Sequence, residues 1–417
     1  MATSRVVLTG LGTVNPLGRN VGEFWDNLIA CKSGIRRIQK FDPAPFASQI
    51  GGEVVGWEGV PPELLDVRES RRMDRFAQFA ITSAIEAVRD SGIDFGKEDR
   101  LRCGVIFGSG IGGLQELEDQ HSRMIEKGPS RVSPFTVPKL MANAGPGNIS
   151  IQFGLKGPNM AVVTACASAA NSIGEAMRTI QRGECDVIIS GGSEAALTKI
   201  GLASFCALKG LSTRNDEPDK ASRPWDKDRD GFLLAEGAGA IILEELDHAR
   251  RRGAKIYAEL IGYGASCDAY HITAPDPEGH GAILAMQRAL QDGRVSPDQV
   301  DYINAHGTST ELGDLAETKA LKITFGSHAA NGLMVSSTKS SHGHMLGASG
   351  GVELIITALT IVKGTVPATL NLENPSDGCD LDYVPLTPRS KKVNVALSNS
   401  FGFGGHNACL LLRRFEG

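Results

Sequence analysis

Residues 6–12 read VVLTGLG and residues 258–264 read AELIGYG, and each is a short apolar run that ends in small residues. Similar runs recur along the chain. Each is followed by a glycine-containing turn and then by a stretch with helical periodicity. This alternation is typical of parallel strands that are joined by crossover helices. The sequence therefore predicts an α/β protein.

The apolar runs occur in the same order in two parts of the chain, which predicts a duplicated half. We expect an N-terminal half at residues 1–253 and a C-terminal half at residues 254–417, divided near the charged segment at 244–255. Two segments without periodicity, 39–62 and 214–230, are expected to be surface excursions. The matched segments, in chain order, are 6–12 with 258–264, the helical stretches 74–90 with 278–292, 104–110 with 302–308, 161–166 with 333–339, and 186–194 with 394–402.

The composition describes a globular protein without a general affinity for nucleic acid or membranes. Hydrophobic residues make up 41% of the 417 positions, charged residues 22% and aromatic residues 6%. With 43 basic and 48 acidic side chains, the net charge of -5 attracts neither nucleic acid nor an anionic membrane. No run approaches the length of about 18 apolar residues that a membrane span needs, and the N-terminus lacks a signal-peptide core. The eight cysteines lack metal-type spacing, so we expect reduced thiols and a cytoplasmic location.

Cys166 lies where an apolar run meets a turn and a helix, in VVTACASAANSIGEAM at 162–177. Backbone N–H groups and the positive end of a helix dipole at such a turn stabilise a thiolate, lower its pKa and provide donors for an oxyanion. The residue is therefore a candidate nucleophile. The alternative is a small buried cysteine, which is what we expect for the other cysteines.

Two histidines that follow strand-like runs are candidates for catalysis. His306, in NAHGTST, follows the run DYINA, so we expect it to project from a strand end into the crevice where α/β proteins bind ligands. His344 lies in STKSSHGHMLGASGGVE, between a strand-like run and a helix. His342 competes with it, and an HxH pair is also a metal-site pattern. No carboxylate or cysteine with ligand spacing accompanies the pair, which disfavours a metal.

The segment SNSFGFGGHN at 398–407 is rich in glycine and follows another strand-like run. Glycines around Phe403 suit a turn that carries a mobile aromatic side chain and a backbone N–H donor. The segment lacks the Lys-Ser/Thr ending of a phosphate loop, and no such nucleotide signature occurs elsewhere. A nucleotide site is therefore not expected.

Four of these segments together resemble the motifs of the 3-ketoacyl-acyl carrier protein synthases: TACASA at 164–169, NAHGTSTELGD at 304–314, KSSHGH at 339–344 and FGFGGHN at 401–407. They occur in that family's order across nearly the whole chain. The resemblance implies a homodimer with a thiolase-like fold, a five-layered αβαβα arrangement of two halves related by pseudo-twofold symmetry. It also implies an acyltransferase of fatty acid elongation. Such an enzyme condenses a Cys-bound acyl chain with malonyl-acyl carrier protein, giving 3-oxoacyl-acyl carrier protein, carbon dioxide and free carrier.

The family's motifs also imply roles for individual residues. Counting from Lys339 in the K-S-x-x-G-H pattern places the catalytic histidine at His344 rather than His342. Ile111 stands where a bulky residue limits the acyl pocket in the long-chain elongating type II members. The implied catalytic residues are Cys166, His306, His344, Lys339 and, through its backbone N–H, Phe403. The implied supporting network is Asp314, Glu317 and Glu353, and the implied substrate contacts are Thr308, Thr310, Ile111, Phe135 and Phe401.

A basic cluster is expected to bind the acyl carrier protein, which is acidic in this family. The stretch VRESRRMDR at 67–75 places four arginines, the last of them Arg75, within eight positions of an acidic chain. Such a patch suits an acidic partner, and the alternative is an ordinary solvated helix face. The implied docking residues are Arg68, Arg71, Arg72, Arg131 and Lys209.

Two other functions stay open at this point. A stand-alone polyketide ketosynthase shares all of the chemistry, and a non-catalytic subunit that binds acyl carrier protein represents a different class. Intact Cys166, His306 and His344 argue against the non-catalytic subunit. The resemblance implies no organic cofactor and no catalytic metal, and it leaves open a structural monovalent cation in the core.

Overall fold

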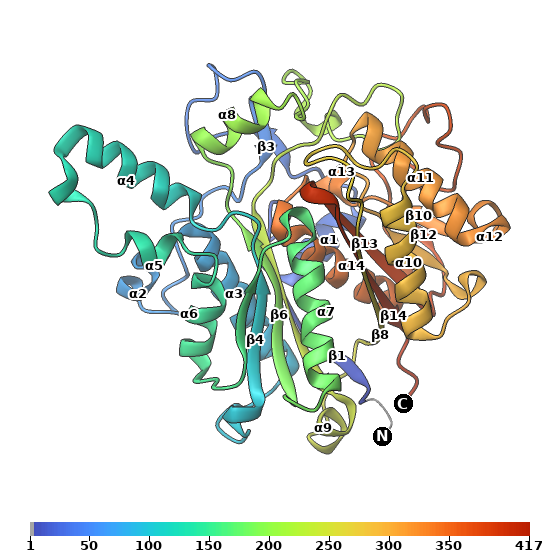
Figure 1. Ribbon diagram of the computed structural model, residues 1–417, viewed down its shortest axis with the longest axis horizontal. Coiled ribbons are helices and arrows are strands. Elements are labelled where there is room, and N and C mark those ends of the chain that lie inside the picture. Colours follow the sequence, from blue (N-terminus) through green and yellow to red (C-terminus); the bar gives the residue numbers. More distant parts are fainter. Residues whose placement is uncertain (1–3) are drawn as a thin grey trace.

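A computed structural model describes residues 4–417, and within them the chain forms one ten-stranded mixed sheet with helices packed against it (Figure 1). From one edge to the other, the strands are β10 (Met334–Ser336), β9 (Tyr302–Asn304), β13 (Val395–Gly402), β14 (His406–Arg413), β8 (Ala258–Cys267), β1 (Val6–Val14), β7 (Gly237–Glu245), β6 (Val187–Glu194), β4 (Cys103–Gly108) and β5 (Asn159–Val162). Two small sheets pair β2 (Ile35–Arg37) with β3 (Ile50–Gly52) and β11 (Thr365–Val366) with β12 (Arg389–Ser390).

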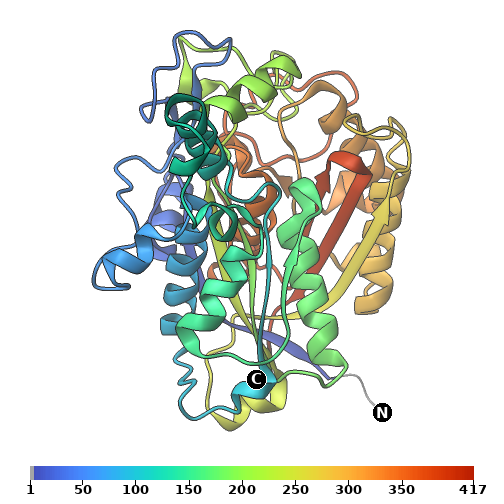
Figure 2. The same ribbon diagram turned by 60° about the vertical axis from the view of Figure 1, so that its left-hand side comes forward.

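Four long helices lie against the main sheet. Helix α3 (Arg75–Ser91) contacts β1 and β7, and α10 (His280–Gly293) contacts β8 and β14. Helices α7 (Ser168–Gln181) and α14 (Ser349–Lys363) contact each other as well as the strands. The other helices are α1 (Val21–Ile29), α2 (Val67–Arg71), α4 (Leu114–Lys127), α5 (Thr136–Leu140), α6 (Ala144–Phe153), α8 (Lys199–Ala207), α9 (Leu246–Arg251), α11 (Glu311–Phe325), α12 (Ser327–Asn331) and α13 (Lys339–His342). Helices α4 and α5 stand out at the left of Figure 1, and Figure 2 brings that side forward.

The small residues that close the apolar runs allow helices to approach the strands closely. A Cβ on Gly12 of β1 would lie 2.0 Å from the Ser83 carbonyl oxygen in α3. A Cβ on Gly264 of β8 would lie 2.0 Å from the Ala285 carbonyl oxygen in α10. Any larger residue would clash with helix backbone at both positions, so glycine sets the spacing between helix and sheet.

The predicted α/β class is confirmed, and the helices expected at 74–90 and 278–292 are α3 and α10. The expectation of parallel strands holds only at the two ends of the sheet, where β4 runs parallel to β5 and β6, and β9 to β10 and β13. In the middle, β1 is antiparallel to both β7 and β8. A strand buried on both faces reads as a continuous apolar run in either direction, so the sequence pattern reports burial and not direction.

The expected surface excursion 214–230 is exposed over much of its length, but residues 221–226 turn inward. Trp225 is fully buried, and its ring stacks on Tyr383 at 4.1 Å between centroids. Arg223 and Asp226 form a buried ion pair at 3.0 Å beside it. The segment lacks periodicity because an irregular loop, not a helix or strand, carries these residues into the core.

The stretch 346–363 is long and apolar enough to cross a membrane, but 89% of it is buried inside the fold. It comprises a short 3₁₀ turn, η6 (Leu346–Ala348), and α14, which packs against β7 and β13. Its apolar character follows from this central position, since a helix that is covered all round is hydrophobic all round.

Candidate active site

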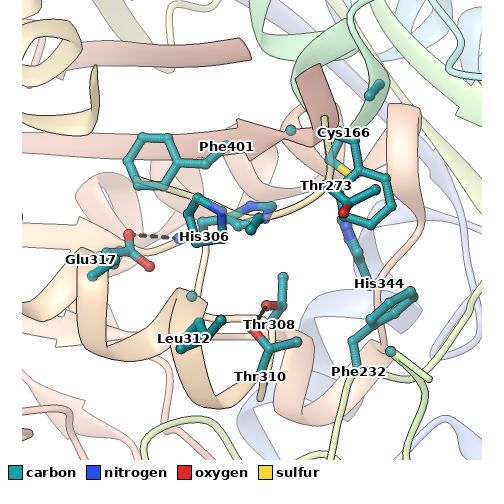
Figure 3. A pocket seen from close by; sticks show the side chains of 18 of the residues that line it. Cys166, Phe232, Thr273, His306, Thr308, Thr310, Leu312, Glu317, His344 and Phe401 are labelled. Atoms are coloured by element: carbon teal, nitrogen blue, oxygen red, sulfur yellow. Dashed lines mark hydrogen bonds between the residues drawn. The ribbon is translucent and has the colours of Figure 1, made fainter. Parts of the chain in front are cut away.

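Three segments that are distant in sequence line one cavity of about 650 Å³ (Figure 3). Cys166 lies in the 3₁₀ turn η3 (Ala165–Ala167) between β5 and α7. His306 follows β9, and His344 lies between α13 and η6. These positions follow the carboxyl ends of parallel strands, which is where α/β sheets place their ligand sites.

Cys166 is 8% exposed and lies two residues before the first residue of α7. Burial raises the pKa of its thiol to about 12, although the Lys339 charge and hydrogen bonds from the backbone N–H groups of Phe403 and Cys166 itself lower it. The prediction of a lowered pKa is therefore wrong in its net sign, because burial outweighs the donors. The cysteine rests as a thiol, with its N–H donors already in place.

The backbone is strained beside each of the three candidate catalytic residues. Ala165, directly before Cys166, has a φ of 49°. Leu346, two residues after His344, has a φ of 44°, and Ser309, in the loop after His306, has a φ of 69°. Residues other than glycine adopt this left-handed region rarely, and each such residue costs about 1–3 kcal/mol.

The two imidazoles lie close together and are both neutral. The ring centroids of His306 and His344 are 5.3 Å apart, and the ring planes are nearly perpendicular at 86°. Burial lowers the pKa of both groups well below the ordinary value, and the Lys339 charge lowers both further. At neutral pH each ring therefore carries one N–H donor and no charge.

Ser349, the first residue of α14, fixes the tautomer of His344. Its Oγ lies 3.0 Å from Nδ1 of His344, and both residues are buried. The hydroxyl has no other hydrogen-bond partner within residues 4–417. If Nδ1–H donated to Oγ, the hydroxyl proton would be buried without an acceptor, so the hydroxyl donates to Nδ1 and the ring proton sits on Nε2.

Lys339 and two glutamates support the loop that carries His306. Lys339 is 1% exposed, forms an ion pair with Glu353, and donates from Nζ to the backbone oxygen of His306 at 2.7 Å. Glu317 accepts from the backbone N–H of His306 at 2.9 Å and from that of Gly307 at 2.8 Å. The cavity lining includes Glu317 but neither Lys339 nor Glu353, so the last two act on the site through His306 and through their charge.

Asp314 supports the next part of the same loop. It accepts from the backbone N–H of Trp225 at 2.8 Å and of Ser309 at 3.1 Å, and Arg229 lies 3.4 Å away. Burial raises the pKa of this carboxyl to about 7. On either side of Ser309, Thr308 and Thr310 line the cavity, and their hydroxyls are 3.0 Å apart.

The glycine-rich segment 401–405 forms another part of the cavity wall. Phe401 lies 5.7 Å from His306 between ring centroids, and Phe403 begins the 3₁₀ turn η7 (Phe403–Gly405). A Cβ on Gly402 would lie 3.0 Å from the backbone nitrogen of Cys166. Glycine at 402 therefore lets the Phe403 N–H reach the sulfur.

His342 and Phe135 lie outside the cavity lining of the described chain. His342 is fully buried, with Nδ1 2.7 Å from the Gly343 oxygen and Nε2 3.1 Å from Oγ1 of Thr338. Phe135 is 43% exposed, and its ring lies 5.5 Å from the Arg72 guanidinium. The structure thus brings together Cys166, His306 and His344 but not these two.

The expected docking residues are exposed, whereas one neighbouring arginine is not. Arg75 is largely buried and pairs with Glu236, so it does not belong to the basic surface. The chain bends between α2 and α3 at Met73 and Asp74, which turns Arg75 inward. Of the docking residues, Lys209 also lines the cavity. The exposed residues are Arg68, Arg71, Arg72, Arg131 and Lys209.

Sequence reasoning missed several residues of the site. Phe232 lies 5.6 Å from His344 between ring centroids, and Thr273 lines the cavity (Figure 3). Neither lies in a recognisable motif. Ser349 and Glu194 carried a signal, since polar residues at the start of an apolar helix and at the end of an apolar strand stand out from their surroundings.

No cluster of three or more histidine, cysteine or acidic residues with metal-binding geometry occurs within residues 4–417. Three buried amide or carboxylate oxygens nevertheless have no hydrogen-bond partner in the described chain: Asn304 Oδ1, Asn399 Oδ1 and Glu353 Oε2. Asn304 pairs with Ser398 in the β9–β13 register, and β9 contacts α14, which carries Glu353. Asn399, one residue further along β13, points to the other face of the sheet and donates from Nδ2 to Glu317. Oxygen donors of this kind fit a monovalent cation.

Comparisons with known proteins match the whole chain. A family model described as Beta-ketoacyl synthase, N-terminal domain, matches residues 3–249, and the corresponding C-terminal domain model matches residues 257–373. A 3-oxoacyl-(acyl-carrier-protein) synthase 2 of Coxiella burnetii is 50% identical over 414 residues, which cover 99% of both chains. The protein of that name in a Synechocystis strain is 49% identical over 412 residues, or 99% of this chain and 98% of that one.

Solved structures are similar over the same extent. One is a type II polyketide-synthase acyl-carrier protein in complex with its ketosynthase bound to a hexaketide. The matched chain has a TM-score of 0.92 at 33% identity, with all of both chains covered. Another is a Beta-ketoacyl synthase from Burkholderia phymatum, with a TM-score of 0.92 at 34% identity over 99% of this chain and 100% of that one.

Proposed function

The chain belongs to the beta-ketoacyl synthase family, and we propose that Cys166, His306 and His344 carry out its decarboxylative condensation. The enzyme joins an acyl chain to malonyl-acyl carrier protein, giving 3-oxoacyl-acyl carrier protein, carbon dioxide and free carrier in fatty acid elongation. One observation carries the residue assignment: a single cavity is lined by the thiol and by both neutral imidazoles.

In the first stage, Cys166 takes the acyl chain from its carrier. The bond between Sγ and the acyl carbonyl carbon forms, the thioester bond to the carrier arm breaks, and the Cys166 proton ends on the departing carrier thiol. The backbone N–H groups of Cys166 and Phe403, which already donate to the sulfur, stabilise the oxyanion. Thr308 and Thr310 bind the phosphopantetheine arm along the cavity.

In the second stage, malonyl-acyl carrier protein occupies the same cavity. His306 and His344 donate hydrogen bonds to its thioester oxygen. When carbon dioxide leaves, the electron pair of the broken carbon–carbon bond forms an enolate, and these neutral donors stabilise its oxygen. The enolate carbon attacks the acyl-Cys166 carbonyl, and the Cys166 sulfur leaves as a thiolate, which takes a proton from water to become the thiol again. Loss of carbon dioxide drives the bond formation, so no oxidant is needed.

The chain's higher sequence identity to 3-oxoacyl-(acyl-carrier-protein) synthases than to polyketide ketosynthases favours fatty acid elongation over polyketide synthesis. Identity is 50% to a 3-oxoacyl-(acyl-carrier-protein) synthase 2 and 33% to a polyketide ketosynthase. The intact thiol and both imidazoles disfavour a non-catalytic carrier-binding subunit.

Acyl carrier protein is the proposed partner of the basic surface. Arg68, Arg71 and Arg72 are exposed, and Lys209 lines the cavity through which the carrier arm would enter. An acidic partner complements this cluster on an otherwise acidic chain. The similarity to a solved complex of a ketosynthase with its acyl-carrier protein supports the same pairing.

We further propose a homodimer that meets at the β5 edge of the sheet. β5 has a neighbour on one side only, and Met160 in it is 44% exposed. Apolar side chains next to this edge are also exposed, Ile151 of α6 at 81% and Val163 directly after β5 at 55%. An open edge with an apolar surround favours pairing with a second copy.

The finer fold assignment and the location are also proposals. A thiolase-like, five-layered αβαβα arrangement with halves at 1–253 and 254–417 is supported by the strand order, in which matched segments stand at equal distances from the β1–β8 pair. A cytoplasmic location is supported by the eight cysteines, all of which are free. A structural monovalent cation in the core is also proposed, and the unpartnered oxygens of Asn304 and Glu353 are its candidate ligands.

Intact-protein mass spectrometry tests the assignment. Wild-type protein is incubated with acyl-acyl carrier protein and then with malonyl-acyl carrier protein, beside Cys166→Ala and, as a matched cysteine control, Cys206→Ala. We expect an acyl adduct in wild type and Cys206→Ala that the malonyl substrate discharges as 3-oxoacyl product, and none in Cys166→Ala. An adduct of equal yield in Cys166→Ala would refute Cys166 as the nucleophile.

A further inference from the structure

Glu194 is a buried carboxylate that the proposed chemistry does not use. It is the last residue of β6 and is 0% exposed. Its two oxygens accept four hydrogen bonds, all from neutral donors. These are Oγ of Ser109 at 3.1 Å and the backbone N–H groups of Gly110 at 2.7 Å, Ile111 at 3.2 Å and Gly347 at 3.1 Å.

The donors belong to two turns from different parts of the chain. Gly110 and Ile111 follow β4, and Gly347 lies in η6, shortly after His344. The turns are in contact, because a Cβ on Gly347 would lie 2.3 Å from the backbone nitrogen of Gly110. Glu194 is therefore a shared anchor, and neither turn can shift without breaking a hydrogen bond to it.

Both anchored turns contribute to the cavity beside Cys166. Ile111 comes from the first turn and Leu346 from the second, and each lines the cavity. The Ile111 side chain is 40% exposed, so packing alone does not hold it. Its position depends on its backbone, and its backbone N–H is bound by Glu194.

Only a carboxylate satisfies all four donors. Each carboxylate oxygen accepts two hydrogen bonds, whereas an amide offers one oxygen and an NH₂ group that would face N–H donors. A buried N–H left without an acceptor costs about 1–3 kcal/mol. Gly110 and Gly347 donate to one oxygen and Ile111 donates to the other, so glutamine would leave either the Ile111 N–H or the other two N–H groups without an acceptor.

We propose that Glu194 is a positioning residue that fixes Ile111 and Leu346 in the wall of the acyl pocket and thereby sets which acyl chain lengths are accepted. This inference rests on the proposed condensation. A rigid pocket wall lowers kcat/KM for acyl chains that do not fit it, and a mobile wall lowers it less. Loss of the anchor thus flattens the chain-length preference.

The test compares kcat/KM for acyl carrier protein loaded with a short, a medium or a long saturated chain in wild type, Glu194→Gln and Glu236→Gln. Glu236 is the matched control, a fully buried carboxylate that accepts from the Val54 N–H at 3.0 Å and pairs with Arg75. We expect Glu194→Gln to reduce the ratio of kcat/KM between the best and the worst substrate about tenfold, which corresponds to a loss of about 1.4 kcal/mol of discrimination. Glu236→Gln should lower the melting temperature and leave the ratio unchanged.

If Glu194→Gln lowers kcat/KM by one factor for all chain lengths, Glu194 only stabilises the fold and the proposal is overturned. Failure of the wild type to form any acyl adduct would instead overturn the proposed function. Where Glu194→Gln does not fold, Glu194→Asp keeps both oxygens and withdraws them by one methylene. It is measured on the same panel and judged by the same ratio.

Discussion

Ser349→Ala removes the hydroxyl that holds the His344 proton on Nε2. The bond is one neutral hydrogen bond of 3.0 Å between buried groups. Such a bond contributes about 0.5–1.5 kcal/mol, which corresponds to a loss of about two- to tenfold in the rate of the step that needs the Nε2–H donor. That step is the decarboxylation and condensation with malonyl-acyl carrier protein. Loading of the acyl chain should not change.

Single-turnover kinetics separate the two stages. Acyl-enzyme is formed first and quantified by mass spectrometry, and malonyl-acyl carrier protein is then added to measure its discharge. Ser349→Cys, which retains a weak donor, should fall between wild type and alanine. Ser341→Ala is the matched control, because that hydroxyl is also buried and has no hydrogen-bond partner in the described chain. Nitrogen NMR of labelled histidine reports the tautomer directly.

Equal discharge rates for wild type and Ser349→Ala would refute the tautomer argument. A loss in Ser341→Ala as large as that in Ser349→Ala would also refute it, because burial of any serine near the site would then explain the effect.

Three further outcomes follow from the contacts described above. Lys339→Met should lower the free energy of unfolding, measured in urea at fixed protein and salt concentrations, by about 3–5 kcal/mol, because it leaves Glu353 buried without its partner. The double variant Lys339→Met with Glu353→Leu should recover most of this loss. Additive losses would contradict the coupling. Arg71→Glu with Arg72→Glu should raise KM for the carrier several-fold with little change in kcat, and the effect should shrink with added salt. Steady-state assays at two ionic strengths measure this. A KM that does not depend on salt would show that these arginines form an ordinary solvated surface. Burial raises the pKa of Glu244, but Arg252, His248 and Thr9 lower it more, to about 2. Since this folded-state pKa lies below the unfolded value, the stabilisation of about 3 kcal/mol is present above about pH 4.5 and is lost as the pH falls toward 2. The free energy of unfolding of Glu244→Gln should therefore fall less steeply than that of wild type between about pH 4.5 and 2. Parallel plots of unfolding free energy against pH for the two proteins would contradict the assignment.

The fold class and the three central residues were predictable because each leaves a local mark. Cys166 and His306 come directly after apolar runs, and His344 follows another after helix α13. Strands buried on both faces leave such runs in any sequence. The direction of β1 left no mark, since burial has the same pattern in parallel and antiparallel neighbours. Trp225 was misjudged for a related reason, because an irregular segment reads as surface even where it enters the core.

Other parts of the site depend on geometry that no pattern encodes. The net pKa of Cys166 is decided by burial, which arises only when η6 and segment 401–405 pack around the sulfur. Arg72 and Arg75 are near neighbours in sequence, yet a bend between two helices exposes the first and buries the second. The link between Ser349 and His344 likewise requires η6 to turn the chain back on itself.

Glycine in place of the left-handed residues Ala165, Ser309 and Leu346 is expected to raise thermal stability and to lower the turnover rate. Each is a position where glycine would relieve about 1–3 kcal/mol of strain, so a laboratory selection for survival at high temperature should draw substitutions there early. The same substitutions loosen the turns that aim the sulfur and the imidazoles. Variants that are enriched by heating should therefore have a lower kcat. Among successive variants of one selection, kcat should fall as the melting temperature rises.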